Sequence, residues 1–215
     1  MRNRPLSRLS TPSYAVDATR WPLPRLLVME ETTRDRIVAA AVEMTTTTGW
    51  ATVTMARLAQ AVGVSRQTVY NEVGTKPALA ETMVLAELAR FLTVVEAAFD
   101  HEPDDLSRAI GRAVSDVLTY AQDNNLLHAV VSATHGADTE LLPLLTTNAG
   151  SLLETAKQVI TTRVAPYAPS INAAHLDPAI DMVVRVVLSH VMQPSATPAQ
   201  TGADLAWLAR RVLEG

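Results

Sequence analysis

The fold of this chain is decided by residues 49–79, which read GWATVTMARLAQAVGVSRQTVYNEVGTKPAL. Thr54 stands in this stretch as an expected N-cap residue, and Gly63 as a residue that ends a helix. Between them, apolar residues recur at i, i+3, i+4 and i+7, the spacing of one helix face: Met55, Leu58, Ala59 and Val62. The spacing predicts a short amphipathic helix bounded by these two residues.

A second short helix follows after a tight turn. Ser65 is its expected N-cap, and the helix is predicted to run from Arg66 to about Val73. Steps of 100° per residue place Val69 and Val73 on one face. The residues across from them are polar: Gln67, Thr68, Asn71 and Glu72. Two short helices joined in this way form a helix-turn-helix, whose second helix enters the DNA major groove, but the periodicity alone also fits an ordinary solvated helix.

Two further helices flank this pair. The first is predicted to begin near Thr33, to fray in the four threonines 45–48, which are poor helix formers, and to end at Gly49. The other begins at Lys76-Pro77, where the missing N–H of proline is harmless, and reaches Phe99 or Asp100. This last helix is expected to span two domains.

The rest of the chain also reads as helices punctuated by proline. Their predicted ranges are Pro103–Gln122, Asn125–Thr134, Asp138–Val164, Pro178–Met192 and Ala203–Leu213. No strand-like alternation of useful length is present in the sequence. The predicted fold is all-α, with a three-helix domain that contains the helix-turn-helix at residues 29–78 and a larger helical domain at residues 79–215.

The stretch from Gly49 to Leu79 closely resembles the DNA-binding domain of the TetR family of transcriptional regulators. The matched features are Gly-aromatic, Thr-Val-Thr, Ala-x-x-x-Gly-Val-Ser, Thr-Val-Tyr and a following lysine. Val73 departs from the pattern, because many relatives have phenylalanine there. With the preceding helix, the resemblance covers residues 33–80, and it implies an N-terminal helix-turn-helix with a helical C-terminal domain.

The resemblance implies roles for individual residues. Thr54, Tyr70 and Lys76 match positions that contact the DNA backbone, whereas Arg66, Gln67 and Thr68 match positions that reach base edges. Arginine can be bidentate to guanine, glutamine to adenine, and a threonine methyl can meet thymine. Asn71 belongs to the same predicted DNA-binding surface.

Two charged residues near this surface leave alternatives open. Arg57 is either a phosphate contact or a solvated helix residue. Glu72 either accepts a hydrogen bond from cytosine, orients Arg66, or faces away from the groove.

Charge is unevenly distributed along the chain. The net charge of −4 argues against a nucleic-acid partner, but residues 1–28 carry +4, residues 29–78 carry 0 and residues 79–215 carry −8. Residues 1–28 hold four prolines without a sustained period, which predicts a disordered basic extension. This extension is either a basic arm that helps to bind DNA or a segment upstream of the native start.

Composition excludes several classes of protein. The chain has no cysteine, which excludes disulfides and thiolate metal sites. The first 28 residues lack the continuous apolar core of a signal peptide, and the longest uncharged stretch, Val186–Ala203, is interrupted by prolines. A soluble protein without a membrane partner is expected, located in the cytoplasm in association with the nucleoid.

The last two predicted helices suggest a homodimer. Pro178–Met192 is apolar nearly all round, so that a second apolar surface remains after one face is buried. The predicted interface consists of Val183, Val184, Val187, Leu188, Val191, Leu205, Leu208 and Val212. Two-fold symmetry then implies a palindromic operator in double-stranded DNA.

The middle helices correspond to those that hold an effector pocket in relatives. They are rich in Leu, Val and Ala, with Tyr120, His128 and His135 as sparse polar or aromatic candidates for contact with an effector. A small apolar effector is expected, and its binding would release a dimeric repressor from the operator. An activator is the alternative, because the position of the operator relative to the promoter, which decides between the two roles, is not encoded in this sequence.

Two classes of protein other than a regulator are alternatives for this sequence. An enzyme is disfavoured, because no nucleophile motif, phosphate loop or paired carboxylates emerge and the histidines lack metal-ligand spacing. No cofactor, metal or catalytic residue is therefore expected. The other rival is a helical interaction protein whose helix-turn-helix no longer binds DNA, which the acidic C-terminal part leaves open.

Overall fold

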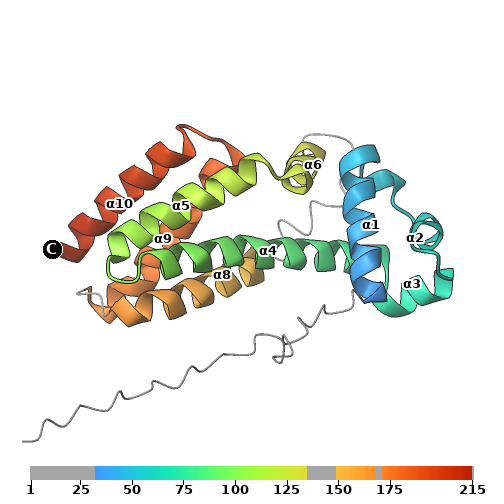
Figure 1. Cartoon of the computed structure of the whole chain (residues 1–215), viewed down its shortest axis with the longest axis horizontal. Coiled ribbons are helices and arrows are strands. Elements are labelled where there is room, and N and C mark those ends of the chain that lie inside the picture. Colours follow the sequence, from blue (N-terminus) through green and yellow to red (C-terminus); the bar gives the residue numbers. More distant parts are fainter. Residues whose placement is uncertain (1–31, 135–148, 168–170, 215) are drawn as a thin grey trace, which may run out of the picture. The chain divides into compact units, whose positions relative to one another are not determined.

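The computed structural model describes residues 32–134, 149–167 and 171–214, and within them the chain is all-α without a strand, as predicted (Figure 1). Three sequence-based predictions lie outside the described residues: the extension 1–28, His135, and the beginning of the helix expected from Asp138.

The N-terminal part consists of α1 (Thr33–Thr48), a 3₁₀ turn (Trp50–Thr52), α2 (Met55–Val62), α3 (Arg66–Val73) and the long α4 (Lys76–His101). The starts of the two short helices are fixed by caps: Thr54 Oγ1 accepts from the Arg57 amide at 3.2 Å, and Ser65 Oγ accepts from the Thr68 amide at 3.0 Å. Gly63 ends α2 with φ of 75°, a conformation that favours glycine. These bounds confirm the predicted helix-turn-helix.

The prediction that the first helix frays in its threonines was wrong. Residues 45–48 are helical, and Gly49 follows with φ of 87°. Each threonine hydroxyl donates to a backbone carbonyl three or four residues earlier, as Thr45 Oγ1 does to Ala41 at 2.7 Å and Thr48 Oγ1 to Met44 at 3.0 Å. These hydrogen bonds satisfy the hydroxyl groups within the helix, so that the four threonines need no other partner there.

A single apolar core holds the N-terminal helices together. Its fully buried members include Ile37 of α1, Leu58 of α2, Val69 of α3 and Leu79 of α4. Leu126, from the C-terminal part of the chain, packs into the same core. Because every helix contributes a side chain, the core fixes α3 relative to its neighbours.

The C-terminal part consists of α5 (Leu106–Gln122), α6 (Asn125–Thr134), α8 (Ala149–Val164), a 3₁₀ turn (Ala165–Tyr167), α9 (Ala173–Met192) and α10 (Pro198–Glu214). The predicted starts of α5, α9 and α10 were wrong. Helix α5 begins at Leu106 rather than Pro103, because Asp105 is the cap and accepts from the Arg108 amide at 3.0 Å.

The other two helices begin earlier than predicted. Asn172 caps α9, which continues through Pro178 instead of starting there. Pro198 is the first residue of α10, a position that proline tolerates.

Helix α5 lies at the centre of this part and packs against both α4 and α10 (Figure 1). The contact with α10 is close because two glycines meet: a Cβ added at Gly111 would lie 2.7 Å from Ala206 Cβ and 2.8 Å from the Gly202 carbonyl oxygen. The absence of side chains at Gly111 and Gly202 therefore sets the distance between the two helices.

Candidate DNA-binding surface and apolar cavity

Helix α3 presents a polar face to solvent while its apolar face is buried. Val69 and Val73 are 0% and 3% exposed, whereas Arg66, Gln67, Tyr70 and Asn71 are exposed. Thr68 and Glu72 are half-buried. A short capped helix that is fixed on one side and polar on the other has the form needed to enter a major groove.

Two exposed amides on this face are joined. Gln67 Nε2 donates to Asn71 Oδ1 at 2.9 Å, one helical turn away. The bond orders both side chains and leaves the Gln67 carbonyl oxygen and the Asn71 amide hydrogens for other partners. The pair therefore offers both an acceptor and donors on the exposed face of α3.

Two arginines of α1 hold the helix-turn-helix in place, and neither was predicted from the sequence. Arg34 donates to the Glu72 carbonyl oxygen at 3.2 Å and to Thr82 Oγ1 at 3.3 Å, so that it joins α1 to α3 and α4. Arg36 donates to the Val62 carbonyl oxygen at 2.6 Å, at the end of α2. Basic residues just before the apolar stripe of α1 were the available signal, because helix ends present unpaired carbonyls that arginine can bind.

The predicted backbone-contact residues lie at the beginnings of helices and at the exposed end of α3. Thr54 is exposed as the cap of α2, and Tyr70 is 44% exposed. Lys76 is half-buried at the first position of α4, and its ammonium lies 4.9 Å from the centroid of the Trp50 ring. Arg57 is exposed, and its Nη1 donates to the Thr52 carbonyl oxygen at 2.9 Å. This bond orders the Arg57 side chain.

An apolar cavity lies among α4, α5, α6, α8 and α9. Its volume is about 210 Å³, and the described residues that line it present no polar surface to it. Its walls include Phe91, Val95, Val117, Ile160 and Val187. Such a space can hold an apolar molecule, and none of the described residues that line it could pair with a charge.

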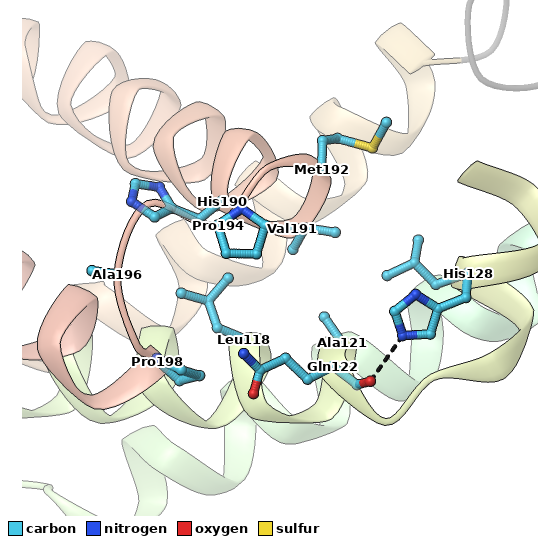
Figure 2. Close-up of a pocket in the computed structure, with 11 residues that line it drawn as sticks. Leu118, Ala121, Gln122, His128, His190, Val191, Met192, Pro194, Ala196 and Pro198 are labelled. Carbon is cyan, nitrogen blue, oxygen red and sulfur yellow. Dashed lines mark hydrogen bonds between the residues drawn. The ribbon is translucent and has the colours of Figure 1, made fainter. Parts of the chain in front are cut away.

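A smaller, partly polar hollow of about 150 Å³ adjoins this cavity. Figure 2 shows Gln122 and His128, near the junction of α5 and α6, across the hollow from Val191 and Pro194 near the end of α9. The His128 ring nitrogen Nε2 lies 2.8 Å from the Gln122 carbonyl oxygen. Leu127 and Val191 line both spaces, so that His128 lies beside the apolar cavity rather than in its wall.

Two models of known protein families match the chain. The model for bacterial regulatory proteins of the tetR family matches residues 37–83, and the model for the bacterial tetracyclin repressor C-terminal domain matches residues 105–211. The chain belongs to the TetR family. Its members are transcriptional regulators that bind DNA through the N-terminal helix-turn-helix described above.

Relatives match this TetR-family chain over most of its length. The HTH-type transcriptional regulator AlkX of Mycobacterium tuberculosis is 28% identical over 207 residues, which cover 93% of each chain. The crystal structure of the TetR family repressor AlkX from a Dietzia species, implicated in biodegradation of n-alkanes, has a TM-score of 0.65 and 25% identity. That comparison covers 85% of this chain and 97% of the Dietzia chain. The repressor QsdR of R. erythropolis shares the fold, with a TM-score of 0.55 and 16% identity over 85% of this chain and 96% of its own.

Tyr120 of this TetR-family chain does not line the apolar cavity. Its hydroxyl donates to Glu87 Oε1 at 2.8 Å, and its ring packs edge to face on Phe91, with ring centroids 4.9 Å apart. Phe91 is a wall residue of the cavity, so that Tyr120 lies behind that wall. Contact of Tyr120 or His128 with an effector stays a prediction.

The residues predicted to form a dimer interface fall into two groups. Val184 and Leu205 are buried within the chain itself, and Val183, Val187 and Val191 are half-buried against the cluster that contains Leu205. Leu188, Leu208 and Val212 are 47–50% exposed. Further exposed apolar residues that the prediction did not include lie on the same two helices: Met182, Val186, Met192 and Trp207.

The described residues were also compared with the requirements of a membrane-spanning helix and of a metal site. None of their helices is both long and apolar enough to cross a membrane. They also contain no group of three His, Asp or Glu residues placed to hold a metal ion.

Proposed function

We propose that this TetR-family regulator is a dimeric repressor that reads a palindromic operator and is released when a small apolar molecule fills the cavity among α4, α5, α6, α8 and α9. The observation that carries the proposal is helix α3, which is anchored by Val69 and Val73 and exposes Arg66, Gln67 and Asn71. Arginine suits guanine, and the paired amides suit adenine.

Backbone contacts complete the proposed DNA surface. Thr54, Tyr70 and Lys76 hold α3 in register on the duplex, while Thr68 adds an apolar contact through its methyl group. Arg57 reaches a phosphate from α2. Phosphate contacts supply affinity and orientation, whereas the base contacts of α3 supply specificity.

The exposed apolar residues of α9 and α10 support a homodimer. Trp207 is 61% exposed and Met182 is 67% exposed, and both helices border an apolar groove of about 170 Å³. Exposed apolar surface of this kind is costly in a monomer and favours burial against a copy. Two-fold symmetry then places two copies of α3 about 34–36 Å apart, one turn of DNA, which requires a palindromic site.

The apolar effector is inferred from the wall of the cavity. A charged ligand would lose its hydration there without gaining a polar partner among the described lining residues. An alkyl chain has no polar group to desolvate and so does not incur this cost. The Dietzia relative is implicated in n-alkane degradation, and structures with the same fold include a FadR in complex with stearoyl-CoA and RolR in complex with resorcinol. We infer an uncharged or long-chain apolar compound for this chain.

Release from DNA follows from linkage between the two sites. A ligand that favours a subunit arrangement with the wrong spacing of α3 lowers operator affinity by the same factor as its preference for that arrangement. Helix α4 is the expected connection, because Leu79 packs in the DNA-binding core while Phe91 and Val95 line the cavity.

A cavity-filling variant tests the effector part of the proposal. Ala156 lines the cavity on α8, and A156F places a ring inside it; Ala97, exposed on α4, gives the control variant A97F. A panel of linear alkanes, alcohols and small aromatics is screened for release of the protein from DNA upstream of its own gene. We expect wild type and A97F to be released by the same compounds, whereas A156F stays bound. An inactive panel, or release of A156F equal to that of wild type, contradicts the apolar effector but leaves DNA binding intact.

A further inference from the structure

A lysine ammonium rests on a buried tryptophan ring at the edge of the DNA-binding surface. Lys76 Nζ lies 4.9 Å from the centroid of the Trp50 ring, within the range of a cation–π interaction. Tryptophan is the side chain that attracts cations most strongly in this way. The two residues are far apart in sequence, so that their contact depends on the fold of the whole N-terminal part.

Lys76 lies at a helix end where a positive charge is ordinarily unfavourable. Lys76 is the first residue of α4, and the N-terminal end of a helix carries a partial positive charge that disfavours a cation. The Trp50 ring face contributes an attraction that offsets part of this effect. The same helix end attracts anions, so an ammonium held there can share a DNA phosphate with it.

Trp50 is a rigid platform for the lysine. It is 3% exposed and belongs to the core that also contains Val53, Met55 and Val69. Lysine normally has a flexible four-carbon side chain that loses rotamer freedom when it binds. A fixed ring under the ammonium reduces that loss before DNA arrives.

We propose that Trp50 is a positioning residue for DNA binding: its buried ring holds the Lys76 ammonium at the start of α4, ready for a backbone phosphate. The inference rests on the proposed binding of DNA by α3. Trp50 itself touches no DNA in this proposal, and acts through Lys76 alone.

The contact can be observed without DNA, because the sequence contains only two lysines, Lys76 and Lys157. In protein labelled with ¹³C-lysine, ring current should move the Lys76 ε-CH₂ proton signals upfield of those of Lys157. Coincident signals for the two lysines would overturn the proposal. The measurement uses the wild-type chain, so that it stands even if a Trp50 variant fails to fold.

A double-mutant cycle tests the functional coupling. Binding of W50L, W50F, K76M and W50L/K76M to a short mixed-sequence duplex is measured as a function of salt. We expect K76M to reduce the salt slope by about 0.9, the value for one phosphate contact. W50L should give a similar reduction and weaken binding several-fold, W50F should retain part of the affinity, and W50L should change nothing further in the K76M background.

Two different failures can be told apart in this experiment. If wild type binds no duplex even at low salt, the proposed function fails. If wild type binds but W50L weakens binding equally with and without K76M, Trp50 is only a structural residue and the inference is wrong. Should W50L fail to fold, W50F carries the cycle, and a W50F loss that persists unchanged in the K76M background overturns the inference.

Discussion

The hydroxyl of Tyr120 on α5 donates a 2.8 Å hydrogen bond to Oε1 of Glu87, a residue of α4 that is only 8% exposed. Asn124 donates to the same oxygen, and Arg90 Nη1 donates to Oε2 at 2.7 Å. Asn124 also accepts from the Leu127 amide at 2.8 Å in the first turn of α6. One carboxylate therefore joins α4, α5 and the start of α6, beside the cavity and next to the DNA-binding core.

We expect Y120F to destabilise the protein. The variant keeps the ring on Phe91 but removes one donor from Glu87, and hydrogen bonds to charged groups contribute about 1.5–3 kcal/mol. Urea unfolding of the two proteins measures the loss. T119A is the control, because the Thr119 hydroxyl is exposed and donates only within its own helix, to Ser115. Equal stability of Y120F and T119A would show that Glu87 does not depend on the tyrosine.

The stability of the protein should fall at alkaline pH partly through Tyr120. Burial, followed by the hydrogen bond to Glu87 and the charge of Glu87, raises the pKa of Tyr120 above its ordinary value of 10.0. The folded state thus binds the phenol proton more tightly than the unfolded chain. This contribution to the free energy of unfolding is complete below the unfolded pKa and is lost as pH rises through the folded pKa.

Unfolding measurements at several alkaline pH values, with wild type and Y120F, test this dependence. Y120F should show a shallower alkaline decline, with a remaining part from Tyr167, whose pKa burial also raises. A decline of the same steepness in both proteins would contradict the assignment.

The crossing of α5 and α10 should not tolerate a side chain at its two glycines. In G202A the new Cβ would lie 2.5 Å from the Gly111 carbonyl oxygen, so the helices must separate. Overpacking of this kind costs about 1–3 kcal/mol. Gly150 provides the matched control in α8, because nothing lies within 4 Å of a Cβ added there. Thermal melting should show a lower Tm for G202A and an unchanged or slightly higher Tm for G150A; the reverse order would refute the close crossing.

A charge on the exposed face of α10 should prevent dimerisation. Leu208 is 47% exposed, and L208D would bury a carboxylate in the proposed interface. Leu85 of α4 is equally exposed, at 48%, which makes L85D the control. Sedimentation velocity should find wild type and L85D as dimers and L208D as a monomer. A dimeric L208D would place the interface elsewhere.

The helix-turn-helix could be predicted from sequence because its determinants are local. Thr54, Gly63 and Ser65 act on residues within one turn of themselves, and the structure places the caps and the helix end where the sequence does. The division into domains at residue 78 stays a prediction. Arg34 escaped prediction because its partners, Glu72 and Thr82, are brought to it only by folding.

The C-terminal part was less predictable for the same reason. The start of α9 was missed because Pro178 was interpreted as a helix start although Asn172 caps the helix earlier. An apolar residue on α9 can serve the core, the cavity or a partner, and periodicity does not distinguish these: Val184 is buried in the core while Leu188 is 50% exposed. The role of Tyr120 depended on its hydrogen bond to Glu87, which lies 33 residues earlier on α4, so that no local sequence pattern could indicate it.

Binding of the full chain to DNA upstream of its own gene is the most direct test of the central claim, that α3 reads an operator. The affinity of wild type is compared with that of R66A and of R108A, which removes an arginine of α5 far along the chain from the helix-turn-helix. We predict salt-dependent binding by wild type and R108A, and a loss of about fivefold or more for R66A, since a bidentate base contact contributes about 1–3 kcal/mol. Absence of binding to any duplex at low salt, or equal affinity of R66A and wild type, would contradict the account.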